Sequence, residues 1–184
     1  MSTAFEPTSL TVPAVVTIDM HRGHLDPEIA TMPLPRSAAA RVVDANIAFL
    51  AAARSQGLPI VHVVTVYRDA NEIHNNPFWK AIDGTSSTRG RMTEHNRPGS
   101  RGAELMPGIE APGDYLVTTK KRYDCFRATE LDFVLRRLGT NTLLITGVNT
   151  NSCVLATTIV AQTREWAPIV ISDCVDTLDG EPYH

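Results

Sequence analysis

Short runs of apolar, often β-branched residues alternate along this chain with longer segments of helical periodicity, and this alternation restricts the possible folds more than any other feature. Nearly continuous apolar strands are typical of a parallel sheet that is covered on both faces. Helices between such strands imply right-handed crossover connections. We therefore predict an α/β fold with an open, mainly parallel sheet and helices on both faces, a Rossmann-like three-layer αβα arrangement. The predicted strands cover residues 12–18, 60–66, 115–119, 142–146 and 168–172, and the predicted helices cover residues 36–56, 129–138 and 151–164.

The length of 184 residues corresponds to about one domain, and we predict a single domain over residues 1–184. Residues 68–110 interrupt the alternation with a long polar stretch. Connections in α/β folds usually have about 2–6 residues, so this insert is expected to be a lid, a binding loop or an oligomer arm. No predicted helix follows the last strand. We expect either that a C-terminal helix is missing or that a neighbouring subunit covers this strand.

Composition excludes several classes of partner. The net charge of −3 at pH 7 gives no electrostatic reason to expect binding to nucleic acid or to an anionic membrane. No apolar run approaches the ~18 residues that a membrane span needs. Three cysteines do not indicate a secreted disulfide framework, and the N-terminus lacks the pattern of a signal peptide. We therefore expect a cytoplasmic protein with no nucleic-acid partner and no membrane partner.

Ionisable and nucleophilic side chains follow three of the predicted strands. Asp19 follows the first strand, Lys120 and Lys121 follow the third, and Cys153 begins the helix after the fourth. Ligands of open α/β sheets bind at the carboxyl ends of the strands, so these groups are expected to converge. Each also has an ordinary structural explanation, as a turn cap, a solvated pair and a packed core cysteine respectively. Together they match a catalytic set in which the aspartate is the base, a lysine is the cation and the cysteine is the nucleophile. The first turn of a helix would stabilise the thiolate form of Cys153.

Three sequence motifs carry a family resemblance. Residues 18–21 read Ile-Asp-Met-His, residues 120–126 read Lys-Lys-Arg-Tyr-Asp-Cys-Phe, and residues 147–154 read Gly-Val-Asn-Thr-Asn-Ser-Cys-Val. With these motifs in this order, each just after a predicted strand, the chain resembles the isochorismatase-like superfamily of cysteine hydrolases. That superfamily includes nicotinamidases and N-carbamoylsarcosine amidohydrolase. The resemblance extends from residue 15 to about residue 180.

The resemblance implies the isochorismatase-like hydrolase fold and an amidohydrolase that cleaves a C–N amide or carbamoyl bond of a small molecule. Cys153 would form a thioester, Asp19 would act as the base, and Lys120 would complete a catalytic triad, because the register of the second motif selects Lys120 over Lys121. The family also has a cis peptide bond before the position of Asn149, and the N–H groups of Asn149 and Cys153 would form the oxyanion hole. Since the family commonly assembles, a homodimer or homotetramer is expected.

The three motifs identify the substrate-binding residues less directly than they identify the catalytic residues. His21 replaces a glutamine of the family, so it either lines the pocket or packs in the core. Arg68 follows the second strand and is expected either to bind a substrate carboxylate or to form a surface salt bridge with Asp69 or Glu72. The predicted substrate-binding residues are His21, Arg68, Trp79, Tyr123, Phe126 and Asn149.

No metal or other cofactor is predicted. Nicotinamidases bind a metal through an Asp-x-His pair and a second histidine after the second strand, but residues 66–70 here read Val-Tyr-Arg-Asp-Ala. His62 lies within a predicted strand and His74 is isolated, so the sequence offers no ligand cluster. The alternatives are a catalytically idle family member that acts in binding or assembly and, less favoured, a nicotinamidase-like or isochorismatase-like activity. Isochorismatases cleave a vinyl ether without a cysteine, and Cys153 argues against that reaction.

Overall fold

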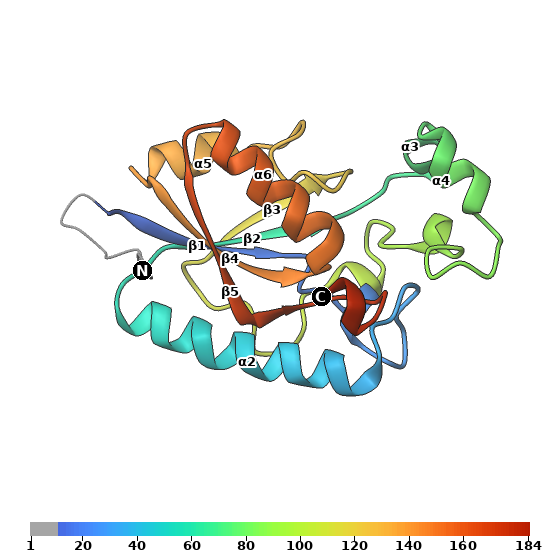
Figure 1. Ribbon diagram of the computed structural model, residues 1–184, viewed down its shortest axis with the longest axis horizontal. Helices are drawn as coiled ribbons and strands as arrows, with labels where there is room; N and C mark the ends of the chain where they lie inside the picture. The colour runs from blue at the N-terminus through green and yellow to red at the C-terminus, as the bar shows by residue number, and fades with distance from the viewer. Residues whose placement is uncertain (1–10) are drawn as a thin grey trace.

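The computed structural model describes residues 11–184 and contains one sheet of five strands (Figure 1). The strands are β1 (Pro13–Ile18), β2 (Ile60–Thr65), β3 (Tyr115–Lys120), β4 (Thr142–Val148) and β5 (Ala167–Asp176). Their order is β3-β2-β1-β4-β5, and every neighbouring pair is parallel. The order of the strands therefore switches direction between β1 and β4, which is where open α/β sheets bind their ligands. The predicted fold class is confirmed.

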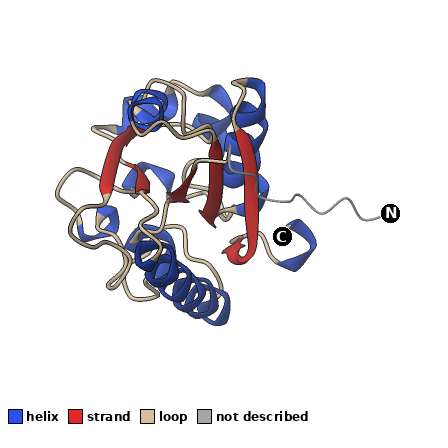
Figure 2. Ribbon diagram, turned by 90° about the vertical axis from the view of Figure 1, so that its left-hand side faces the viewer, coloured by secondary structure: helices blue, strands red, loops and turns tan. Residues whose placement is uncertain are grey.

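Helices cover both faces of the sheet (Figures 1 and 2). The longest helix, α2 (Arg36–Ser55), lies on one face, and α5 (Leu131–Arg137) and α6 (Leu155–Thr163) lie on the other. Each face has its own cluster of buried apolar side chains, one around Leu50 of α2 and one around Leu135 of α5. None of the helices that the structure describes combines the length and the apolar character that a membrane span needs.

Most predicted boundaries differ from the observed ones by one or two residues, and three elements differ in a way that has a structural cause or consequence. β5 continues through Asp176, beyond its predicted end. α5 begins at Leu131 because the hydroxyl of Thr129 donates a hydrogen bond to the carbonyl of Cys125 and accepts one from the N–H of Leu131. The predicted helix over residues 151–164 is divided into a π-helical turn and α6. The shorter elements are α1 (Arg22–Leu25), α3 (Ala70–His74), α4 (Pro77–Ile82), the 3-10 turns η1 (Met92–Glu94), η2 (Arg101–Ala103) and η4 (Glu181–Tyr183), and the π-helical turn η3 (Thr150–Val154).

The close approach of β4 to β1 depends on Gly147. Its φ is +109°, and the Cβ of any other residue would lie 2.0 Å from the carbonyl oxygen of Ile18. Only glycine combines that backbone conformation with the absence of a side chain. The ends of β1 and β4 therefore lie side by side, and the loops that follow them start from the same edge of the sheet.

The long insert has two parts. The outer part contains α3 and α4, which stand away from the sheet at the right of Figure 1. The returning part comes back to the end of the sheet, where the Asn96 side chain donates to the carbonyl of Thr65 and the N–H of Tyr67 donates to the carbonyl of Asn96. An antiparallel bridge between His21 and Leu105 joins this part to the segment after β1.

Gly23 of α1 makes room for the returning part. A Cβ at this position would lie 2.1 Å from Oδ1 of Asn96 and 3.0 Å from Cε1 of His95. His95 and Asn96 are each 1% exposed. The returning part is therefore packed directly on α1.

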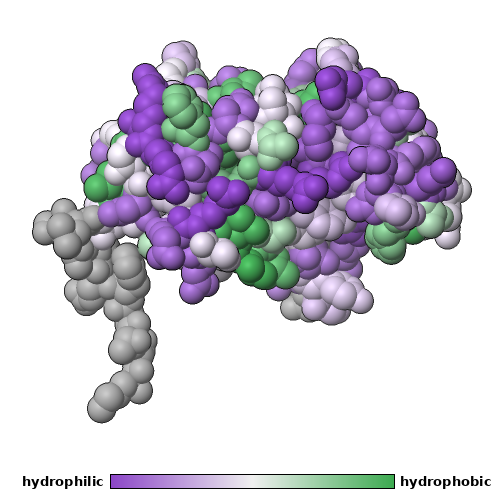
Figure 3. Space-filling model, turned by 90° about the horizontal axis from the view of Figure 1, so that it is seen from above, coloured by the Kyte–Doolittle hydropathy of each residue, from purple (hydrophilic) through white to green (hydrophobic). Residues whose placement is uncertain are grey.

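The surface over α5 and α6 is mainly polar, with separate apolar patches (Figure 3). Phe133 of α5 and Leu155 and Ile159 of α6 are 71%, 51% and 57% exposed. Leu155 and Ile159 are one helical turn apart, so they lie on the same side of α6.

Candidate active site

Asp19 directly follows β1, and its carboxylate is held by the neighbouring strands. It is 1% exposed and has a φ of +52°, a left-handed conformation that aspartate tolerates better than most residues. Oδ1 accepts hydrogen bonds from the N–H and the hydroxyl of Thr65, both at 2.8 Å. Oδ2 accepts one from Nζ of Lys120 at 2.6 Å. Both carboxylate oxygens are therefore fixed in position.

Lys120 is the last residue of β3, and its side chain is buried. Besides the contact with the carboxylate, its ammonium group donates to the hydroxyl of Thr65 at 2.5 Å and to Sγ of Cys153 at 3.3 Å. The side chain of Lys121 points elsewhere, since it donates to a backbone carbonyl after β2 and its Nζ lies 3.7 Å from Glu72. The structure therefore brings Lys120, and not Lys121, to the acid and the thiol.

Cys153 lies in η3, just after β4, and is 5% exposed. The sequence predicted that Cys153 begins a regular helix, whose first turn would stabilise a thiolate. Instead, burial raises the pKa of the Cys153 thiol to about 11, and the charge of Lys120 offsets only part of this effect. The resting group is a neutral thiol, so the expectation of a stabilised thiolate is corrected.

Asp19 and Lys120 form a buried ion pair. Burial alone would raise the pKa of Asp19, but the charge of Lys120 and the contact with His21 outweigh it and hold this pKa well below its usual range. Burial alone would lower the pKa of Lys120, but the charge of Asp19 outweighs it and holds this pKa well above its usual value. Both groups are charged at neutral pH. The site therefore combines a carboxylate base, an ammonium group and a neutral thiol.

The segment between β4 and η3 brings Asn149 to the same edge of the sheet. The peptide bond between Val148 and Asn149 is cis. Oδ1 of Asn149 accepts a hydrogen bond from the N–H of Leu178 at 2.8 Å, and its carbonyl accepts two N–H groups of η3. Asn149 is 3% exposed and lies beside Cys153 in the wall of one pocket.

Lys120 and Cys153 both line this pocket, and Asp19 is buried behind them. Its wall includes Lys120, Asn149, Cys153, Trp79, Tyr123, Arg89 and Arg122. The guanidinium carbon of Arg122 lies 4.8 Å from the centre of the Trp79 ring. Arg89 donates two hydrogen bonds, at 2.9 and 2.7 Å, to the carboxylate of Asp179. One side of the pocket is thus aromatic and carries guanidinium groups.

Four predicted substrate-binding residues lie in or next to the pocket. Trp79, Tyr123 and Asn149 line it. His21 is fully buried, and its Nε2 lies 3.5 Å from Oδ1 of Asp19. His21 is therefore placed beside the carboxylate, not at the pocket mouth.

The other two predicted substrate-binding residues lie elsewhere, and their assignment is corrected. The side chain of Arg68 is 80% exposed, and its Nε donates to Glu72 at 2.5 Å. The carboxylate one helical turn later thus captures the guanidinium group, as the salt-bridge alternative predicts. Phe126 is 4% exposed and packs in the apolar core on the side of α5 and α6, because its ring is buried among residues such as Leu131.

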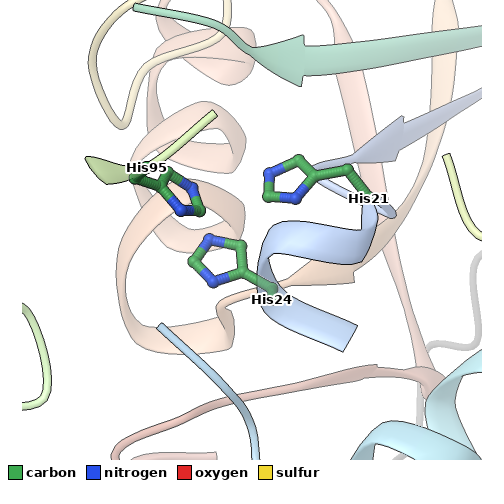
Figure 4. Close-up of side chains that lie close together, drawn as sticks. All are labelled: His21, His24 and His95. Atoms are coloured by element: carbon green, nitrogen blue, oxygen red, sulfur yellow. The ribbon is translucent and has the colours of Figure 1, made fainter. Parts of the chain in front are cut away.

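Three histidines lie together (Figure 4), and one of them, His21, lies beside the carboxylate of Asp19. The ring centroids of His21, His24 and His95 are 4.8, 5.2 and 4.7 Å apart, and all three rings are buried. Burial lowers the pKa of His24 to about 3 and holds that of His95 well below its usual value, so both rings are neutral at physiological pH. One ring nitrogen of each histidine lies within 4.8 Å of the others. The expectation of no metal rested on the lack of a ligand cluster, and that premise is wrong.

Three residues of this region, Thr65, His24 and His95, were not predicted from the sequence. Thr65 ends β2, so the strand-end argument that selected Asp19 applies to it as well. His21 and His24 are three positions apart, a spacing that brings side chains together on one helical turn. His95 lies in the irregular returning part of the insert, and no local pattern in the sequence places it.

Comparison with known proteins gives matches over most of the chain. Residues 13–184 match the family model of the isochorismatase domain. A ureidoacrylate amidohydrolase of Methylorubrum extorquens is 31% identical over 145 residues, which are 74% of this chain and 58% of that protein. A maleamate amidohydrolase of Pseudomonas putida is 24% identical over 171 residues, which are 93% of this chain and 75% of that protein. The chain thus spans little more than half the length of the ureidoacrylate amidohydrolases that it matches.

Solved structures give the same result for the fold. N-carbamoylsarcosine amidase from Thermoplasma acidophilum is 28% identical and has a TM-score of 0.67, with 89% of this chain and 83% of that chain covered. Nicotinamidase from Bacillus subtilis is 20% identical and has a TM-score of 0.72, with 91% of this chain and 88% of that chain covered. At this identity the likeness to the nicotinamidase shows the fold alone.

Proposed function

The chain belongs to the isochorismatase family, and from this premise we propose that it is an amidohydrolase that cleaves a C–N amide or carbamoyl bond of a small molecule through a thioester on Cys153. The observation that carries the proposal is the ammonium group of Lys120, which lies 2.6 Å from Asp19 and 3.3 Å from the Cys153 thiol beside a pocket. Support for the bond type comes from the names of similar proteins, a ureidoacrylate amidohydrolase, a maleamate amidohydrolase and an N-carbamoylsarcosine amidase.

The first half of the reaction forms the thioester. Sγ of Cys153 attacks the substrate carbonyl carbon while Asp19, which lies within hydrogen-bonding reach of the thiol, takes its proton. Transfer of the proton during attack suits a thiol whose pKa is about 11, because no free thiolate has to form first. The C–N bond then breaks as Asp19 passes the proton to the leaving amine or ammonia.

The second half hydrolyses the thioester. Asp19, again a carboxylate, removes a proton from water, and the water oxygen attacks the thioester carbon. The C–S bond breaks, the acid product leaves, and the proton returns to Cys153. Lys120 keeps Asp19 ionised and stabilises negative charge on sulfur, and Thr65 is a positioning residue that holds Oδ1 of Asp19 through two hydrogen bonds.

The developing oxyanion of the tetrahedral intermediate is assigned to the N–H groups of Asn149 and Cys153. In support, both residues are buried and line the same pocket. Backbone donors fixed before the reaction need no reorganisation as charge develops, and the loss of one such donor typically lowers a rate by ~10²–10³.

The test measures release of ammonia or amine from N-carbamoyl compounds, ureas and primary amides, with mass spectrometry of the acid-quenched protein. The wild-type protein is expected to carry an acyl group on Cys153, and Cys153→Ala is expected to lose both turnover and the adduct. Cys174→Ala removes another buried thiol that does not line the pocket, so it is expected to keep both. Hydrolysis by Cys153→Ala above about a tenth of the wild-type rate would refute covalent catalysis by this residue. Failure to release product from the whole panel would favour the binding role instead.

A further inference from the structure

We propose that His21, His24 and His95 form a binding site for one divalent transition-metal ion, such as Zn²⁺, in the wall of the pocket that holds Cys153. The proposal rests on the geometry of the three imidazoles and not on the proposed reaction. His21 and His24 come from the segment after β1, and His95 comes from the returning part of the insert (Figure 4). One ring nitrogen of each lies within 4.8 Å of the others.

Unpaired ring nitrogens are the first argument for an ion. Nδ1 of His21 and Nε2 of His95 are buried without a hydrogen-bond partner, and Nε2 of His21 has only the carboxylate of Asp19, at 3.5 Å. Buried polar side-chain atoms in proteins almost always have such a partner, and each exception requires an explanation. An ion bound between the three rings would be coordinated by one such nitrogen of His21 and by one of His95.

The remaining nitrogens are arranged as they are around bound metals. Nδ1 of His24 lies 2.8 Å from the carbonyl oxygen of Met32, which can only accept, so this nitrogen carries the proton and Nε2 keeps a lone pair. Nδ1 of His95 lies 2.7 Å from the hydroxyl of Thr31, which leaves Nε2 of His95 free. Histidine ligands usually donate their second N–H to a carbonyl, a carboxylate or water, which fixes the tautomer and the ring orientation.

The charges around the cluster are balanced. The carboxylate of Asp19 lies 3.5 Å from Nε2 of His21, and the ammonium group of Lys120 is bound to the same carboxylate. The three rings therefore lie beside an ion pair in which the charges of Asp19 and Lys120 offset each other. A carboxylate behind one histidine is also the usual arrangement of a histidine ligand and its partner.

The donor set indicates the type of ion. Three imidazole ligands suit Zn²⁺, Co²⁺, Ni²⁺ or Fe²⁺, and not Mg²⁺ or Ca²⁺, which prefer oxygen. Tetrahedral ligands bound at about 2.0–2.1 Å are separated by about 3.3 Å, so the rings have to turn inward when the ion binds. His24 and His95 line the same pocket as Cys153. The fourth position would therefore be open to a water or to an oxygen or nitrogen atom of a pocket ligand.

The test is metal binding by the full chain after it has been stripped with a chelator. Titration with Co²⁺ is expected to give a visible d–d absorption band that saturates at one equivalent, and Zn²⁺ is expected to displace it. His24→Gln and His95→Gln are each expected to weaken Co²⁺ binding by at least about 100-fold. His74→Gln is the matched control, because His74 is half-buried, pairs with Asp83 at 2.9 Å and lies outside the cluster, so binding is expected to be unchanged.

Three results would overturn the proposal. The first is no saturable Co²⁺ or Zn²⁺ binding by the wild-type protein, which decides the question without any variant. The second is equal binding by folded His24→Gln and His95→Gln proteins, with folding checked by circular dichroism and thermal melting. The third is a thiolate-to-cobalt band that disappears in Cys153→Ala, which would place the ion on the thiol. Each readout is independent of turnover, so a failure here leaves the proposed amide hydrolysis untouched.

Discussion

Replacement of Lys120 by methionine removes the ammonium group while keeping most of the apolar stem of the side chain. Asp19 then retains its hydrogen bonds from Thr65 but loses the cation 2.6 Å from Oδ2, in a position where it is only 1% exposed. Loss of one partner from a buried ion pair costs roughly 3–5 kcal/mol, because the remaining charge is uncompensated. Protonation of Asp19 would relieve part of this cost, but it would also remove the proposed base. We therefore expect Lys120→Met to lose about 3 kcal/mol of unfolding free energy and to lower kcat/KM by about 10²–10⁴-fold, the usual contribution of a general base.

The assay combines urea denaturation, followed by circular dichroism, with initial rates on the best substrate of the amide panel. Lys121→Met is the matched control, because it is the same change at the next position, where the side chain is 26% exposed and its nearest carboxylate is Glu72 at 3.7 Å. Such pairs contribute about 1 kcal/mol or less, so we expect little loss of stability and at most a several-fold change in rate. Equal losses in the two variants, or a larger loss in Lys121→Met, would refute the assignment of Lys120.

Three further predictions follow from other parts of the structure. Gly147→Ala would put a Cβ 2.0 Å from the carbonyl oxygen of Ile18, so we expect the free energy of unfolding, measured by urea denaturation, to fall by at least about 2 kcal/mol. A variant as stable as the wild type would contradict the close approach of β4 and β1. The guanidinium group of Arg89 lowers the pKa of Asp179 from 3.8 to about 2, which stabilises the folded state by about 2 kcal/mol above pH 4. Asp179→Asn should lower the free energy of unfolding by this amount at neutral pH. The difference in unfolding free energy between the variant and the wild type should disappear as the pH falls toward 2. A difference that stays the same at every pH would exclude the ion pair as its cause. A homodimer or homotetramer is expected in light scattering, and Ile159→Asp, on the exposed side of α6, is expected to shift it toward monomer; a wild-type monomer at micromolar concentration would contradict this.

The parts of the fold and of the site that the sequence predicted are those that depend on local pattern and on one general rule. Apolar runs and helical periodicity identified all five strands and the three long helices. The rule that sites form at the carboxyl ends of parallel strands brought Asp19, Lys120 and Cys153 together, although they are far apart in the chain. Alternation along an extended strand means that only one of Lys120 and Lys121 can face the site, and the resemblance of the second motif to the family selected Lys120.

The parts that the sequence could not predict depend on burial and on the path of the insert. The pKa of the Cys153 thiol is raised to about 11 by desolvation, and a sequence carries no direct measure of how dry a position is. For Arg68 the sequence left a substrate carboxylate, Asp69 and Glu72 as possible partners, and only the fold shows that it pairs with Glu72. His95 reaches His21 and His24 because the insert folds back over α1, and a polar stretch without periodicity gives no indication of that path.

The two parts of the insert differ in how well they are expected to tolerate substitutions, both in natural relatives and in engineered variants. The returning part is locked against α1 by the lack of space at Gly23 and by the buried side chain of Asn96, so changes there disturb the end of the sheet. The outer part reaches the pocket through Trp79 and is anchored by buried Ile73, while most of its other residues are at least partly exposed where α3 and α4 stand away from the sheet (Figure 1). Exchange of α3 and α4 between relatives should therefore alter which molecules fit the pocket while the acid, the lysine and the thiol stay in register. Substitutions intended to change the substrate should therefore be made in this outer part, and the residues that pack against Gly23 should be kept unchanged.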